Sequence, residues 1–120
     1  MAGIHAFDFD APDETRRPDK TQVDVIRFGG TTAARYTFQP GWKWSECVKP
    51  VVGTDSCQVQ HVGVVQSGRL HVMHDDGSEA DLGPGDAYVI EPGHDAWVTG
   101  DESFVGLEFE SHSAEEYARS

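Results

Sequence analysis

Two side chains that could bind a metal ion or move a proton, Cys57 and His61, lie four positions apart. His61 opens a valine-rich run, and alternation along a strand places both on one side if the strand reaches back that far. A thiolate and an imidazole could share one ion, and Asp55 could add an oxygen. The spacing therefore indicates a divalent-metal site, and it leaves Zn, Fe, Mn, Ni and Cu open.

The same residues also support readings without a metal. His61 could be a hydrogen-bonded histidine of the protein interior, with Cys57 as ordinary packing. In a metal-free enzyme His61 could instead act as a catalytic general base, because imidazole titrates near neutral pH.

Candidate substrate contacts flank this region. Trp42 and Trp44 alternate with Lys43, as in a half-buried strand, and they could line the mouth of a cavity for a planar ligand. Aromatic pairs at this spacing also occur in cores, so that alternative stays open. Gln66, near the end of the valine-rich run, is a further candidate contact.

The elements that must position these residues are predicted to be β-strands. Thirteen glycines and six prolines indicate many turns, and Asp75-Asp76-Gly77 is the strongest turn signal. The spacing of the runs predicts strands at 23–28, 32–38, 59–66, 69–74, 78–82, 87–90, 96–99 and 104–109. We expect an all-β chain of eight to ten antiparallel strands, with an extended arm over residues 1–22, a barrel over 23–112 and a short helix in a tail over 113–120.

Length and charge restrict the protein's class. A chain of 120 residues is expected to form one domain, and its net charge of −12 disfavours nucleic acid and anionic membranes as partners. No run approaches the roughly 18 apolar residues of a membrane helix, and the acidic N-terminus does not resemble a secretory signal. We therefore expect a cytoplasmic protein. In that compartment a disulfide between Cys47 and Cys57 is the minority reading, although their separation allows one.

Motifs for several other chemistries are missing from the sequence. It contains no G-x-S-x-G, no phosphate-binding P-loop, no dinucleotide fingerprint and no C-x-x-C. We therefore expect no nucleotide cofactor.

The order of glycine and proline turns resembles the cupin superfamily over about residues 40–110. That family is described by two motifs, G-x5-H-x-H-x3,4-E-x6-G and G-x5-P-x-G-x2-H-x3-N. The matching residues are His61-x6-Gly68, Asp76-Gly77, Gly83-Pro84-Gly85-Asp86 and Pro92-Gly93. The resemblance implies a jelly-roll β-barrel or sandwich, often paired as a homodimer, with a small-molecule or metal site inside.

The ligand positions of the two motifs hold other residue types here. His61 occupies the family's glutamate position, and the preceding histidine positions fall on Asp55 and Cys57, or on 54 and 56 with the longer spacer. Ala96 occupies the histidine position of the second motif. His94 would face the same way along an extended strand and could supply that imidazole, or it could be an exposed loop residue.

Two functions follow as expectations. The first is a cupin-like protein that binds a small organic molecule inside the barrel, with or without a divalent metal held by His61, Cys57, His94 and Asp55. The alternative is a metal-dependent enzyme of oxygenase, isomerase or cyclase type. A third reading gives the acidic arm a structural role in contacting a partner or a second subunit.

Overall fold

The computed structural model describes residues 3–28 and 31–109, and their fold is predominantly antiparallel β-structure. Within these residues lie nine strands and two single-turn helices. The strands are β1 (Glu14–Arg16), β2 (Thr21–Phe28), β3 (Thr31–Phe38), β4 (His61–Ser67), β5 (Leu70–His74), β6 (Glu79–Leu82), β7 (Ala87–Ile90), β8 (His94–Val98) and β9 (Phe104–Phe109). The predicted number of strands is confirmed in this part of the chain. The predicted C-terminal helix lies outside the described residues.

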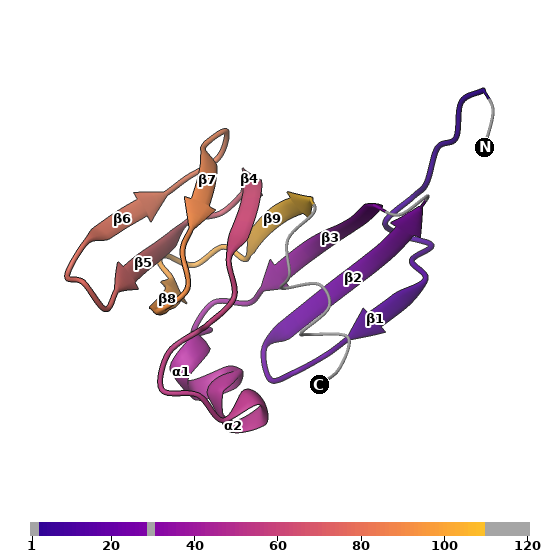
Figure 1. Cartoon of the computed structure of the whole chain (residues 1–120). Helices are drawn as coiled ribbons and strands as arrows, with labels where there is room; N and C mark the ends of the chain where they lie inside the picture. The colour runs from indigo at the N-terminus through magenta and orange to yellow at the C-terminus, as the bar shows by residue number, and fades with distance from the viewer. Residues whose placement is uncertain (1–2, 29–30, 110–120) are drawn as a thin grey trace.

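The strands form two sheets that face each other. The larger sheet has the order β1-β2-β3-β9-β4-β7, and the smaller has the order β6-β5-β8 (Figure 1). Chain connections pass repeatedly from one sheet to the other: β4 and β7 belong to the larger, whereas β5, β6 and β8 belong to the smaller. This crossing arrangement is a jelly-roll sandwich, as predicted.

The long hairpin of β2 and β3 is paired in register from Thr21 opposite Phe38 to Phe28 opposite Thr31. Turns at the predicted glycines connect most other strands. Gly77, between β5 and β6, has a φ of 93°, a left-handed conformation that favours glycine. The observed strand ends lie within two residues of the predicted ones.

Part of the segment 1–22, expected to be an extended arm, is joined to the larger sheet. The short strand β1 pairs antiparallel with β2, with Glu14 opposite Val25 and Arg16 opposite Val23. Side chains strengthen this edge, because Arg27 and Arg16 both form ion pairs with Glu14. The β-structure therefore begins before residue 23.

The strand expected through Trp42 and Trp44 is absent, and this prediction was wrong. Lys43 forms only an isolated bridge to Trp97, and Trp44 begins helix α1 (Trp44–Cys47). Helix α2 (Lys49–Val52) follows and ends at Gly53, whose φ of 79° closes the helix. The alternation of aromatic and charged residues suggests a strand because Lys43 is extended and both tryptophans are buried, but the chain turns into a helix at Trp44.

The core fills the space between the sheets. Tyr36 and Phe104 are 1% exposed, and Phe38 stacks on Trp42 with ring centroids 3.8 Å apart. The indole nitrogen of Trp42 donates a hydrogen bond to the Thr21 hydroxyl at 2.8 Å. In the part of the chain that the structure describes, neither helix is long and apolar enough to cross a bilayer.

Candidate metal centre

Three buried side chains bring a sulfur and two imidazoles together. Cys57, His61 and His94 each offer one ligand atom, and these atoms all lie within 4.8 Å of one another. The three residues are 6%, 9% and 3% exposed. The structure thus brings together three of the four residues proposed as metal ligands from the sequence.

Each sheet of the sandwich contributes to this cluster. His61 is the first residue of β4 in the larger sheet, and His94 is the first residue of β8 in the smaller one. Cys57 lies in the loop before β4 and forms an isolated antiparallel bridge with His94, whose carbonyl accepts a 2.7 Å hydrogen bond from the Cys57 amide. The strand predicted from residue 59 begins only at His61. Cys57 and His61 therefore meet because the chain crosses between the sheets here, not because they alternate along one strand.

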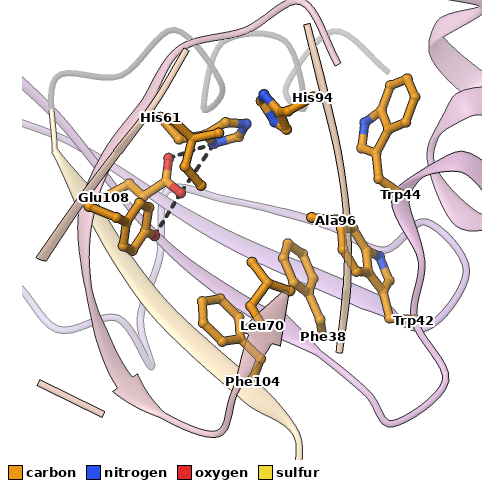
Figure 2. Close-up of a pocket in the computed structure, with 11 residues that line it drawn as sticks. Phe38, Trp42, Trp44, His61, Leu70, His94, Ala96, Phe104 and Glu108 are labelled. Carbon is orange, nitrogen blue, oxygen red and sulfur yellow. Dashed lines mark hydrogen bonds and ion pairs between the residues drawn. The ribbon is translucent and has the colours of Figure 1, made fainter. Parts of the chain in front are cut away.

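Glu108 holds the other side of the His61 ring. Its carboxylate accepts a hydrogen bond from His61 Nδ1 at 2.9 Å and a second from the Tyr88 hydroxyl at 2.9 Å (Figure 2). Glu108 is 5% exposed. The ring of His61 is thus fixed at Nδ1 by a buried carboxylate, while Nε2 lies 3.5 Å from the sulfur of Cys57.

A glycine makes the contact between Tyr88 and Glu108 possible. Gly63 on β4 lies between them, opposite Tyr88 on β7 and opposite Glu108 on β9. A Cβ atom at Gly63 would lie 2.3 Å from the Leu107 carbonyl oxygen and 2.8 Å from Cγ of Glu108. The missing side chain therefore leaves the space in which the two neighbours join.

The same contacts shift the pKa values of the cluster. Burial alone would lower the pKa of His61, but the charge of Glu108 and the hydrogen bond with Cys57 outweigh it and raise that pKa to about 10. Burial would raise the pKa of the Cys57 thiol, but hydrogen bonds with His61 and His94 lower it to about 6. Burial and then the neighbouring Glu108 raise the pKa of Tyr88. Without a metal, the arrangement favours a Cys57 thiolate beside a protonated His61 at neutral pH.

His94 is oriented in a similar way to His61. Its Nδ1 donates a hydrogen bond to the Glu91 carbonyl at 2.8 Å, so Nε2 is its potential ligand atom. Hydrogen bonding of the second ring nitrogen to a carboxylate or a backbone carbonyl is the usual way in which proteins orient metal-binding histidines.

The donor set fits a transition metal. Zinc bonds of about 2.3 Å to sulfur and about 2.0 Å to nitrogen at a tetrahedral angle separate the two donors by roughly 3.5 Å. The observed separation of Cys57 Sγ and His61 Nε2 is 3.5 Å. Thiolate and imidazole suit zinc, copper, iron or nickel better than magnesium or calcium. Binding would displace the proton on Nε2 of His61, since ligands must be deprotonated.

A small cavity borders the two imidazoles. Its volume is about 30 Å³. Apart from His61, His94, Tyr88 and Glu108, its lining is apolar or aromatic: Phe38, Trp42, Trp44, Leu70, Ile90, Ala96 and Phe104 (Figure 2). A pocket for an organic ligand usually has a volume of about 300–1,000 Å³. This cavity has room only for water or for a molecule of two or three non-hydrogen atoms.

The remaining sequence-based candidates lie elsewhere or have other partners. Asp55 points into solvent and pairs with Lys49 at 3.7 Å, so it is not part of the cluster. Gln66 is exposed on β4 and is not among the residues that line the cavity. Trp42 and Trp44, both 3% exposed, line the cavity wall as part of the core rather than at an open mouth. Cys47 and Cys57 are both free thiols, so the disulfide alternative is not realised.

Glu108 is not among the site residues proposed from the sequence. Its alternation with Phe104 and Gly106 could have indicated burial, because these three alternate positions of β9 are the buried ones. The apolar side chain of Phe109 suggests that its own face of the strand is the buried one, but Phe109 is 46% exposed. Tyr88 carried no sequence signal beyond its place in a β-rich run.

Comparison with known proteins finds similarity of structure only. No family model matches the sequence, and no curated protein matches it. A protein of unknown function from Rhizobium leguminosarum is 19% identical with a TM-score of 0.64, over 90% of this chain and 96% of that one. KdgF from Halomonas sp. is 18% identical with a TM-score of 0.60, over 90% and 92%.

Solved structures described as cupins are among the matches. A sugar phosphate isomerase from a cupin superfamily, from Silicibacter pomeroyi, is 18% identical with a TM-score of 0.61, over 88% of this chain and 74% of that one. An RmlC-like cupin from Shewanella frigidimarina is 18% identical with a TM-score of 0.60, over 87% of each chain. At these identities the likeness concerns the fold, and together with the two facing sheets it establishes that this chain has the cupin fold.

Proposed function

We propose that this chain is a transition-metal-binding protein in which Cys57, His61 and His94 hold one divalent ion. The observation that carries the proposal is the convergence of three buried donor atoms within 4.8 Å. Support comes from the orienting hydrogen bonds on both imidazoles, to Glu108 and to the Glu91 carbonyl. Three protein ligands would leave a further coordination position open, as in catalytic rather than structural zinc sites.

Such an ion would supply a Lewis acid or activate a bound water beside the cavity. The residues of this chain would do the rest. Glu108 keeps the proton of His61 on Nδ1, and the apolar walls formed by residues such as Leu70 and Phe104 limit the water around the site. This supports a metal-dependent enzyme on a small substrate, the alternative expected from the sequence.

Metal titration tests the proposal. Chelator-treated protein should bind one Zn²⁺ or Co²⁺ per chain, and the Co²⁺ form should show the absorption band of a thiolate ligand. Cys57→Ala and His94→Ala should each weaken binding by more than the roughly 10–100-fold typical of residues that only orient a ligand. Cys47→Ala is the matched control, because Cys47 is an equally buried thiol outside the cluster. Equal binding by Cys57→Ala and Cys47→Ala would refute the site.

A second candidate function uses the same side chains without a metal. The sulfur of Cys57 lies 3.5 Å from Nε2 of His61, whose Nδ1 is held by Glu108, which is the order of a nucleophile, its base and an orienting carboxylate. In this reading Cys57 attacks an electrophilic carbon of the substrate as a thiolate.

Alkylation separates the two functions. With iodoacetamide the sulfur of Cys57 forms a bond to the methylene carbon and iodide leaves. Metal-free protein should be modified at Cys57 faster than at Cys47 at pH 7, because its thiol has the lowered pKa. One equivalent of Zn²⁺ should suppress that reaction if the metal site is the functional one. Undiminished alkylation of Cys57 in the presence of Zn²⁺ would favour the nucleophile.

A further inference from the structure

Ile90 separates two hollow regions of this molecule. On one side lies the cavity of about 30 Å³ that borders His61 and His94. On the other side a groove of about 470 Å³ runs between the β5–β6 hairpin and β7. Ile90 and Tyr88 line both. The groove has the volume of an ordinary ligand pocket, whereas the cavity does not.

The position of Ile90 places it next to the proposed metal site. It is the last residue of β7 and pairs in register with His61 on β4. Residues opposite each other on neighbouring strands point to the same face of the sheet, with their Cβ atoms about 4.5–5.5 Å apart. The half-buried side chain of Ile90 therefore stands beside the imidazole of His61 and packs against the core.

The other shared wall residue is held in place. The Tyr88 hydroxyl donates to Glu108 and lies between two glycines whose missing side chains make room for it. A Cβ at Gly106 would lie 2.8 Å from that hydroxyl, and one at Gly63 would lie 3.0 Å from it. Among the two residues that separate cavity and groove, Ile90 is thus the one held by apolar packing alone rather than by a hydrogen bond.

We propose that Ile90 is a specificity-determining residue that restricts the open position of the metal site to ligands of one to three non-hydrogen atoms, such as water, dioxygen or azide. The proposal rests on the proposed metal-binding function. It follows from the cavity volume of about 30 Å³, because roughly 10–15 Å³ of such space holds one water. Shortening Ile90 joins the cavity to the groove and admits a ring-sized ligand.

The test uses the full chain loaded with Co²⁺ and follows the visible absorption of the ion. Azide should change the spectrum of the wild-type protein, whereas imidazole at the same concentration should not. In Ile90→Ala, imidazole should change the spectrum and bind at least about 10–200-fold more tightly than to the wild-type protein, since a single methylene in a pocket already produces that range. Val62→Ala is the matched control, because Val62 is adjacent to His61 in the chain but 38% exposed.

Ile90→Val serves as the milder variant if Ile90→Ala does not fold, and it should show the same change to a smaller extent. Imidazole binding to the wild-type and Val62→Ala proteins as tightly as to Ile90→Ala would overturn the role of Ile90. A wild-type spectrum unaffected by azide would overturn the small-ligand position. Failure of the chain to bind Co²⁺ at all would instead refute the metal site itself, so the two failures can be told apart.

Discussion

At the scale of single residues, the chemistry of the site depends on which ring nitrogen of His61 carries a proton and on whether the Cys57 sulfur carries one. Glu108 accepts the Nδ1 proton of His61, and this leaves Nε2 to interact with Cys57. A buried carboxylate in this position does two things: it orients the ring, and its charge favours the imidazolium when no metal is bound. The carboxylate thus acts on the ligand atom through His61.

Glu108→Gln should therefore weaken metal binding without removing a ligand. We expect the dissociation constant for Co²⁺ to rise about 10–100-fold, the usual effect of losing an orienting carboxylate. Titration followed by absorption measures it, with Glu102→Gln, in an exposed loop, as the control. An unchanged constant in a folded Glu108→Gln protein would contradict the positioning role.

A second histidine gives a prediction about pH. Hydrogen bonds with Asp81 and then Glu79 raise the pKa of His71 above its ordinary value. A pKa raised by folding means that protonated His71 stabilises the fold below about pH 6.5, and that this stabilisation is lost as the pH rises through the folded-state pKa. An NMR titration of the His71 ring should show the raised pKa, and Asp81→Asn should lower it. Identical titration curves for the two proteins would exclude this cause.

At the scale of elements, three neighbouring strands build the support of the site. β7, β4 and β9 lie side by side in the larger sheet, and Tyr88, Gly63 and Glu108 form a row across them. The Tyr88 hydroxyl can reach Glu108 because Gly63, which lies between them, has no side chain. The register of β4 against its two neighbours therefore determines whether Glu108 can reach both Tyr88 and His61.

Gly63→Ala should disturb this row. The new Cβ would lie 2.3 Å from the Leu107 carbonyl oxygen, so the backbone of β9 must move. We expect a loss of stability of about 1–3 kcal/mol, as for other overpacked positions, together with weaker metal binding. Urea unfolding measures the first effect. Gly85→Ala is the comparison variant, because a Cβ at Gly85 strains the backbone at a positive φ but meets open space instead of a neighbour. If Gly85→Ala weakened metal binding as much as Gly63→Ala, the steric argument would fail.

At the scale of the whole molecule, the candidate site joins the two sheets. His61 belongs to the larger sheet and His94 to the smaller, and Cys57 lies on the connection between them. An ion held by all three would link the layers of the sandwich. A ligand that binds only the folded state stabilises it by mass action.

Metal should consequently raise the melting temperature. At a free concentration 100 times the dissociation constant, the gain is about 2.7 kcal/mol. Calorimetry with Zn²⁺ and after chelation should show a reversible shift that is absent from His94→Ala. The same shift in His94→Ala would mean that the ion binds elsewhere.

The fold could be predicted from the sequence to a large extent because its signals are local. Turn residues such as Asp75-Asp76-Gly77 and Gly83-Pro84-Gly85 specify backbone conformations directly, and β-branched runs between them mark strands. Their order was sufficient for the resemblance to a jelly roll. Local signals failed at Trp44, because the backbone changes there from the extended conformation of Lys43 to a single helical turn, while Trp42 and Trp44 both stay buried.

The sequence by itself identified Cys57, His61 and His94 as candidate ligands, because sulfur and imidazole are chemically distinctive wherever they occur. Only the tertiary structure decided which of the proposed donors meet. Asp55, two residues from Cys57, faces solvent, whereas Glu108, 47 positions beyond His61, holds its ring. The physical reason is that contacts across a sandwich depend on strand register and on the packing of one sheet against the other, and neither is encoded in the local pattern of residues.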